Sequence, residues 1–502
     1  MNNYKLVQMK KAILKYILLT LFLGILTFSK AQNSENIYLK LDDVILMAHQ
    51  RAPDALIATH RFRSGYWQYR YFKADYKPQL ALSGTPVSFT NAYTYVQTPD
   101  GGVYAPYYQM SSNLGLSLTQ KVGLTGGEIS LSSSLRQLLY FDDNTIEYIS
   151  NPIGITLSQP LFGYNSFKWE KRIEPLKFLE AKQTYLESME QVSITATNYF
   201  FDLLLAQITV KIQEINLANN DTLYQIAKGR YNMGTIAENE VLNMELNYLN
   251  SSSALQTSLL DLEMKMFTLK SYLRIQKNAA ITLVPPVEIP DLVINVTSAI
   301  SEAEKNRADA IAFERRMLEA NSELNMAKAD GRFSADLAVT YGLNQQSTDL
   351  NMAYSDPRDQ QAVYLGLEIP ILDWGRARGK IKMAESQREL VVTSIEQERI
   401  DFNQDVFLKV MQFNMQKNQV LIAAKSDTVA AKRYNFTKQR YLIGTIDITE
   451  LNSSMADKDS KRKGYITALH SYWLNYYQIR KLTLFDYQKE QAIGADFNML
   501  LD

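Results

Sequence analysis

Two long stretches of the chain carry apolar residues at alternating steps of three and four positions. This spacing places the apolar side chains on one stripe of a helix, as in a coiled coil. Between about residues 163 and 231 the one proline is Pro175, close to the start, so the pattern predicts a nearly uninterrupted helix of about 100 Å. The stripes consist of Phe178, Ala181, Tyr185, Met189, Val192, Ala196, Tyr199 and Leu203, and of Leu255, Leu259, Leu262, Met266, Leu269 and Leu273.

Ahead of the long helices the apolar residues recur at every second position instead. The clearest runs are Leu114, Leu116 and Leu118; Ile153, Ile155 and Leu157; and Val363, Leu365, Leu367 and Ile369. Period two predicts β-strands with one apolar and one polar face, in the regions 78–161 and 335–371. A lipid-facing barrel strand and a half-buried sheet of a soluble protein share this pattern.

The chain contains two copies of one unit. The segment Arg230–Ile236 (RYNMGTI) recurs as Arg440–Ile446 (RYLIGTI), a displacement of 210 residues (444 − 234). Farther upstream, Lys73-Ala74-Asp75 recurs as Lys328-Ala329-Asp330, a displacement of 255 (328 − 73). The first copy therefore has 45 additional residues (255 − 210), which predict an extra hairpin around Gly123–Gly127. The pattern leaves open whether this hairpin adds strands to a sheet or extends a loop.

Each copy follows the same plan: a helix, a strand region and a helical hairpin. The hairpins turn at Gly234 and Gly444, which suit the positive φ of a tight helix end. The predicted order is a signal peptide at 1–31; a first repeat at 32–284 with a helix at 41–75, strands at 78–161 and a tip at 230–236; a proline-rich crossover at 285–297; a second repeat at 298–484 with a helix at 298–330, strands at 335–371 and a tip at 440–446; and a C-terminal tail at 485–502.

The first 31 residues have the features of a secretory signal peptide. Lysines come first, the run 17–28 is almost wholly apolar, and Ser29-Lys30-Ala31 ends in small residues suited to cleavage before Gln32. The alternative, a membrane anchor, is disfavoured because the apolar run is well short of the roughly 20 residues that a spanning helix needs. No later segment is apolar enough to span as a helix, so a membrane-inserted form would require strands closed into a barrel.

Composition excludes several classes of function. Lys+Arg and Asp+Glu both number 53, so no net positive charge favours nucleic acid. The absence of cysteine excludes thiolate chemistry, disulfides and lipidation at an N-terminal Cys. Three dispersed histidines predict no metal site. Phosphate-loop, dinucleotide and nucleophile-elbow motifs are missing, so we expect neither an enzyme nor a cofactor.

At the tips the sequence resembles the TolC family of outer membrane efflux proteins. Members of that family carry an Arg/Tyr-x-x-Gly turn at each tip, with an acidic residue six positions after the glycine. Glu240 and Glu450 stand at those places here. Gln159–Gly163 and Trp374-Gly375 are also similar to the strand-to-helix junctions of the family. In its order of motifs, the resemblance covers essentially the whole chain after the signal peptide.

The resemblance implies a mixed α and β membrane protein that assembles as a homotrimer. Each chain would supply four strands to a 12-stranded outer-membrane β-barrel, continuous with a periplasmic α-helical barrel of coiled-coil hairpins. It also implies partners: outer-membrane lipid, and a periplasmic adaptor (membrane fusion) protein linked to an inner-membrane pump. The residues expected to dock the adaptor are Arg230, Tyr231, Gly234, Thr235, Arg440, Tyr441, Gly444 and Thr445. The alternative for these residues is that they only form the turns.

The resemblance further implies a periplasmic gate formed by Glu240, Tyr441 and Glu450, with Glu240 bonding to Tyr441 in the closed tunnel. The alternative is that Glu240 is an ordinary solvated side chain. Two positions depart from the family pattern: Ser453 replaces a second acidic residue, and Ile446 stands where a gate arginine can occur. These departures leave ion selectivity and the closing mechanism open.

The function expected from the sequence is passive export of small molecules or polypeptides through an outer-membrane duct. The competing function is a periplasmic coiled-coil scaffold or adaptor that never enters the membrane. Paired strand regions ahead of each hairpin favour the duct, because a scaffold of coiled coils has no use for them. The sequence does not identify the cargo or the class of pump.

Overall fold

The computed structural model describes residues 36–99, 101–275, 280–286 and 288–501, so the predicted signal peptide lies outside the described residues. The chain divides into two compact units. One combines the chain up to Ala55 with 192–291 and 415–475, and the other combines 56–191, 292–414 and 476–502. Within the described ranges, no helix has an apolar stretch long enough to cross a membrane.

Each copy begins with two helices where one was predicted. The region 41–75 contains α2 (Leu41–Arg51) and α3 (Pro53–Asp75), separated at Ala52, whose ψ of 142° is extended. A residue before proline avoids the helical region, and Pro53 itself suits the first position of a new helix. In the second copy, α6 (Val296–Asn306) and α7 (Ala308–Asp330) are separated by an extended Arg307.

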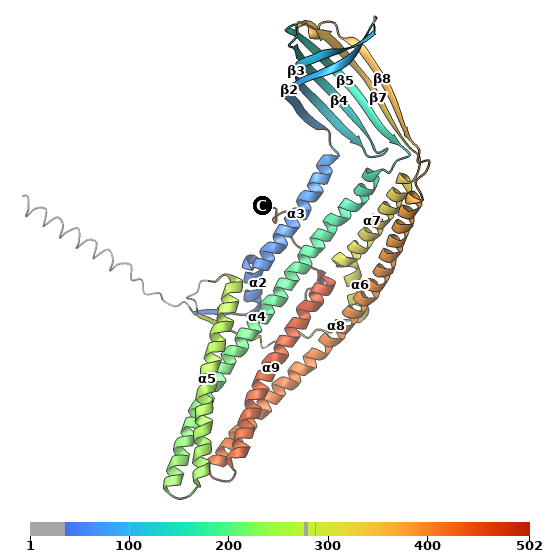
Figure 1. Cartoon of the computed structure of the whole chain (residues 1–502). Coiled ribbons are helices and arrows are strands. Elements are labelled where there is room, and N and C mark those ends of the chain that lie inside the picture. Colours follow the sequence, from blue (N-terminus) through green and yellow to red (C-terminus); the bar gives the residue numbers. More distant parts are fainter. Residues whose placement is uncertain (1–35, 100, 276–279, 287, 502) are drawn as a thin grey trace, which may run out of the picture. The chain divides into compact units, whose positions relative to one another are not determined.

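The two helical hairpins have matching dimensions. The first consists of α4 (Ser166–Asn232) and α5 (Glu238–Leu273), and the second of α8 (Arg376–Leu442) and α9 (Ile448–Thr483). Both hairpins pair a helix of 67 residues with one of 36, and every boundary differs by 210 between the copies. Pro175 lies inside α4, which begins nine residues before it at Ser166, so the proline does not mark the start of the helix. Figure 1 shows each pair of helices joined by a short turn.

The strand regions form one antiparallel sheet with the order β2-β3-β4-β5-β7-β8. The strands are β2 (Gln79–Thr98), β3 (Gly101–Val122), β4 (Gly127–Tyr140), β5 (Thr145–Leu161), β7 (Ser334–Ser347) and β8 (Arg358–Glu368). The sheet thus has six strands, whereas the family resemblance implied that each chain supplies four strands to a barrel. The additional residues of the first copy are long enough to pair along the sheet, so they add two strands instead of a loop.

Each unit also contains short secondary-structure elements. In one unit, β1 (Asn36–Leu39) pairs in parallel with β6 (Ala280–Leu283). In the other, the loop between β7 and β8 holds the 3-10 turn η1 (Met352–Tyr354), and the C-terminal tail holds β9 (Phe485–Asp486) and β10 (Gln491–Ala492).

The tail packs against α3 and α4 and is part of the core of its unit. The ring of Phe497 lies 5.1 Å from that of Phe62, and Nε of Arg63 donates to the carbonyl of Leu500 at 2.6 Å. Phe62 and Tyr185 are almost completely buried in the same cluster. Burial of these rings fixes the end of the chain onto the two helices.

Candidate functional site at the hairpin tips

Both tips close with the same hydrogen-bonded turn. In the first, the backbone N–H of Thr235 donates to Arg230 and that of Gly234 donates to Tyr231, at 3.0 and 2.8 Å. The second tip repeats both bonds at 3.0 Å, from Thr445 to Arg440 and from Gly444 to Tyr441. This is the Schellman arrangement that satisfies the last carbonyls of a helix.

Glycine and threonine each have a structural reason to occupy these turns. Gly234 and Gly444 have φ of 71° and 79°, in the left-handed region that costs other residues free energy. The hydroxyls of Thr235 and Thr445 donate to the carbonyls of Arg230 and Arg440, at 2.9 and 3.0 Å. Turn formation therefore accounts for these four positions without any partner protein.

The two tips lie side by side and are joined by Arg230. Its Nη2 donates to the carbonyl of Leu442 in the second tip at 3.1 Å, and its guanidinium lies 6.0 Å from the ring centre of Tyr441. Because the acceptor is a backbone carbonyl, this bond connects the two hairpins and does not depend on the side chain at position 442. Leu442 was not among the predicted site residues because a backbone acceptor leaves no signal in the sequence.

A hollow opens between the tips, with walls from both hairpins. Its lining comprises Arg230, Thr235, Ile236, Asn239, Glu240 and Asn243 from the first hairpin, and Tyr441, Gly444, Thr445, Ile446, Asp447 and Ile448 from the second. Beneath it lies an apolar cluster that includes Leu223, Met244, Tyr434 and Leu451. The structure therefore brings Glu240 and Tyr441, the predicted gate pair, into one site.

The electrostatic surroundings of Tyr441 combine opposing effects. Burial raises the pKa of its phenol, the Arg230 guanidinium lowers it, and the Glu240 carboxylate raises it again. Among the hydrogen bonds of the described residues, none joins Glu240 to Tyr441, and the bond that crosses the tips is that of Arg230. Tyr441 is therefore held neutral beside one cation and one carboxylate.

Glu450, the third predicted gate residue, lies in the first turn of α9. Its backbone N–H donates to Oδ1 of Asp447 at 2.9 Å, so Asp447 caps the helix. The Asp-x-x-Glu spacing is a capping signature that the sequence contained. At the matching place in the first hairpin, Ala237 has an extended N-cap conformation and makes no side-chain cap. The side chains of Tyr231 and Arg440 are exposed.

A second polar cluster, which sequence analysis missed, lies in the other unit. Arg480 on α9 donates two hydrogen bonds to the carboxylate of Glu190 on α4, at 3.0 and 2.9 Å. Its Nη1 also donates to Oδ2 of Asp486 at 2.7 Å. Glu190 is only 2% exposed. The partners are up to 290 residues apart in sequence, so no local motif could reveal them.

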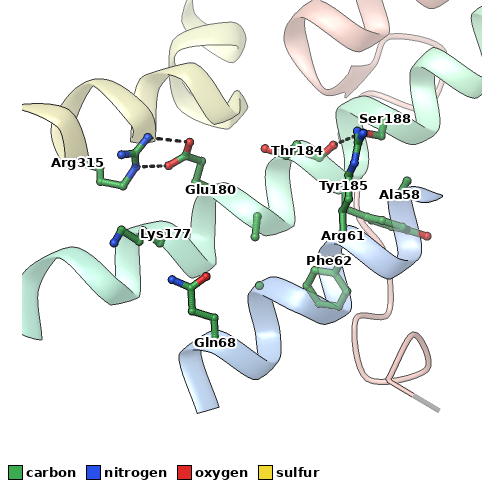
Figure 2. A pocket seen from close by; sticks show the side chains of 12 residues that line it. Ala58, Arg61, Phe62, Gln68, Lys177, Glu180, Thr184, Tyr185, Ser188 and Arg315 are labelled. Atoms are coloured by element: carbon green, nitrogen blue, oxygen red, sulfur yellow. Dashed lines mark hydrogen bonds and ion pairs between the residues drawn. The ribbon is translucent and has the colours of Figure 1, made fainter. Parts of the chain in front are cut away.

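The groove in Figure 2 lies between α3, α4 and α7, and Arg315 in its lining is already paired with carboxylates. Arg315 binds Glu180 through two hydrogen bonds of 2.5 and 3.1 Å, drawn as dashed lines, and reaches Glu319 at 2.7 Å. These carboxylates hold the pKa of Arg315 above its usual value, although burial opposes them. Across the described residues, no group of three or more His, Cys, Asp or Glu side chains could hold a metal ion.

Comparisons with known proteins point to one family. Residues 299–483 match the family model described as outer membrane efflux protein. This stretch belongs to the outer membrane efflux protein family. The efflux protein domain thus covers most of the second predicted repeat, including α8 and α9 with their tip. No curated protein sequence matches the chain.

Solved structures extend the similarity beyond the efflux protein domain to almost the whole chain. The CmeC outer membrane channel of Campylobacter jejuni has a TM-score of 0.66 at 15% identity, with 91% of this chain and 88% of that chain covered. A membrane protein from Pseudomonas aeruginosa has 0.64 at 14%, covering 88% and 93%. The outer membrane protein VceC of Vibrio cholerae has 0.62 at 13%, covering 90% and 96%. The chain therefore has the mixed α and β fold of these proteins.

Proposed function

We propose that this chain is the exit duct of an efflux or secretion system in the bacterial outer membrane, extending into the periplasm. One observation carries the proposal: two helical hairpins of equal length, tied tip to tip, occur in a fold shared with outer membrane channels. The family of the matched domain is one of transport ducts. The duct is passive, and the energy for export comes from the pump.

The duct is a homotrimer, as the family resemblance implies, and an unpartnered stripe on α8 supports assembly. Met415, Ile422, Val429 and Phe436 recur at intervals of seven, yet each is between 53% and 67% exposed. The residues 210 positions earlier on α4 are covered or half-covered, because α9 packs there through contacts such as Asn216 to Asp459 at 2.6 Å. A coiled-coil stripe left open in one chain needs a partner helix.

The partner helix is supplied by α5 of a neighbouring copy. Its exposed face carries Leu242, Leu246, Leu249, Leu260 and Phe267, each between 54% and 64% exposed. Leu249 and Leu260 on α5 correspond, 210 residues later, to Asp459 and His470 on α9. Both of these α9 residues contact α4 within the chain. Packing of α8 on a neighbour's α5 would thus repeat the packing of α4 on α9. A head-to-tail contact of this kind closes into a ring.

The same displacement suggests a role for Arg440. Within the chain, Arg230 donates to the carbonyl of Leu442 in the second tip. In the ring, Arg440 would donate to the carbonyl of Asn232 in the first tip of the neighbouring copy. The periplasmic adaptor would dock on this ring of tips, where Tyr231 remains exposed.

The sheet inserts into outer-membrane lipid as part of a β-barrel. Its apolar side chains are exposed in the single chain, for example Leu80 at 68% and Val363 at 74%. Exposed apolar rows alternating with polar ones suit a strand with lipid on one side and water on the other. The competing scaffold function has no use for such a face.

Fractionation tests the duct against the scaffold. We expect the protein in outer-membrane extracts as a trimer in detergent, with Phe436→Asp weakening the trimer and Phe436→Leu preserving it. An aspartate at this position would be buried against α5 of the neighbour and carry a large desolvation cost. A soluble periplasmic monomer would refute the duct and support the scaffold.

Conductance in planar bilayers tests the gate. Glu240→Ala combined with Tyr441→Phe should raise single-channel conductance, because both residues line the hollow between the tips. Glu263→Ala on the exposed side of α5 is the matched control, since Glu263 lies outside the hollow. Equal conductance in the two variants would remove Glu240 and Tyr441 from the gate.

A further inference from the structure

One face of the sheet carries apolar side chains on all six strands, arranged in two neighbouring rows. Paired residues follow one another across the strands: Leu80 on β2, Leu118 on β3, Leu131 on β4, Ile155 on β5 and Tyr341 on β7. One step along the strands, a second row runs through Ile129, Leu157, Val339 and Val363, and so reaches β8. The apolar face therefore extends from one edge of the sheet to the other.

The opposite face is polar or small on the same six strands. One row consists of Gln79, Thr119, Ser130, Thr156, Thr340 and Ala362, and the next of Ala81, Ser117, Ser132, Gly154, Gly342 and Gln360. The hydroxyls of Thr156 and Thr340 lie 3.1 Å apart, within hydrogen-bonding distance. β2 and β3 thus have one apolar and one polar face, as the other four strands do. They therefore suit a barrel wall with lipid on one side and water on the other.

The edges of the sheet allow this wall to continue into another copy. The two outermost strands are β2 and β8, each paired on one side only within the described residues. With an even number of alternating strands, β2 and β8 run in opposite directions. Pairing β2 of one copy with β8 of the next therefore continues the antiparallel ladder and removes both exposed edges.

We propose that each copy contributes all six strands to the barrel wall, so that three copies form an eighteen-stranded barrel for polymer-sized cargo. This inference rests on the proposed trimeric duct. Barrel diameter grows roughly in proportion to strand number, so the bore is about 1.5 times that of a twelve-stranded barrel. The two central rows that face the bore contain small or neutral side chains. The barrel therefore has the width to pass bulky cargo, such as an extended polypeptide.

Cysteine cross-linking tests which strand meets β8 of the neighbour. The chain has no cysteine of its own, so a disulfide reports only the introduced pair. Leu82→Cys on β2 is combined in turn with a cysteine at each apolar-face position of β8, such as Val363→Cys or Leu365→Cys. We expect at least one of these pairs to give covalently linked chains after oxidation. The control places Leu131→Cys on β4 in the same series, where β3 and β5 already flank the strand.

The outcomes separate the inference from the proposed function. Cross-links in the Leu82 series alone support the six-stranded wall. Trimers that cross-link only in the Leu131 series, or in neither, would overturn it while leaving the duct intact. A protein that forms no trimer would refute the proposed function, and this inference with it.

Exclusion of neutral polymers gives an independent measure of the bore. Poly(ethylene glycol) of increasing size is added on the barrel side of a planar bilayer, and the size that no longer lowers conductance is determined. A variant without residues 79–126 lacks β2 and β3. In this variant a glycine–serine linker joins Pro78 to Gly127, because two strand spacings, about 10 Å, separate β2 from β4. We expect the intact protein to admit polymers about 1.5 times wider than this variant does. The proposal would be overturned if the intact protein and the variant excluded polymers of the same size. It would also be overturned if a known twelve-stranded channel had the same polymer cut-off as the intact protein.

Discussion

Removing Arg480 should destabilise the unit that contains it more than any single surface change. Its guanidinium neutralises Glu190, which is 2% exposed, through two hydrogen bonds of 3.0 and 2.9 Å. Arg480→Gln would leave this carboxylate buried without its cation. Breaking a buried ion pair from one side costs about 3–5 kcal/mol, mostly through the unpaired charge that remains.

The loss should depend on pH in a defined direction. Burial raises the pKa of Glu190 while Arg480 lowers it, so the variant leaves burial unopposed and the folded-state pKa rises further. A carboxyl with a raised folded-state pKa stabilises the fold when protonated, and that stability is lost as pH rises through the folded pKa. The deficit should thus be largest near about pH 8 and shrink towards about pH 5. Asp486 also loses Arg480 in this variant, but the backbone N–H groups of Gln488 and Lys489 still donate to its carboxylate and favour its charged form.

Thermal unfolding of the protein in detergent, followed by circular dichroism at several pH values, measures both effects. Glu190→Gln alone and the double variant Arg480→Gln/Glu190→Gln complete a double-mutant cycle. The double variant should recover most of the loss, because a neutral amide replaces the buried charge. If the double variant were as unstable as Arg480→Gln at every pH, the buried-charge reasoning would be refuted.

Three further changes test local features by the same melting assay. Gly444→Ala should cost about 1–2 kcal/mol because φ is positive there, and an unchanged melting temperature would contradict the turn geometry. Asp447→Ala should lower the stability by about 1 kcal/mol, because it removes the cap of α9. Ala237→Asp should raise the stability by a similar amount, because it adds a cap to α5. Changes of melting temperature with the same sign in both variants would contradict the capping assignment. Gly65→Val should destabilise by about 1–3 kcal/mol, since a Cβ there lies 2.9 Å from that of Ala181, and Ala181→Gly should relieve it.

The features that the sequence predicted well are those encoded locally. The stripes on α4 and α5 and the glycine turns at Gly234 and Gly444 depend on residues a few positions apart, and all are present. The break at Pro53 was also visible, because proline restricts the residue before it, yet a single helix was expected. The break at Arg307 has no such signal.

Features that depend on distant partners were not predictable. The alternation around Leu114 indicated strands but not which strand each would pair with, so the number of strands in the sheet remained open. Arg480 and Glu190 each have the composition of ordinary helix surface, and only the fold brings them together. Glu450 was predicted as a gate residue, whereas its spacing from Asp447 also fits a helix cap, and the capping bond is present.

The equal helix lengths restrict how the protein can change through evolution. A single inserted residue in α4 would rotate everything beyond it by about 100° and shift the first tip by about 1.5 Å. The bond from Arg230 to Leu442 would then no longer meet its acceptor, because the second hairpin would be unchanged. Insertions are tolerable only when they occur in both hairpins together and in whole heptads, each of which lengthens a helix by about 10 Å. The reach of the hairpins is thus a shared property that neither copy can alter alone.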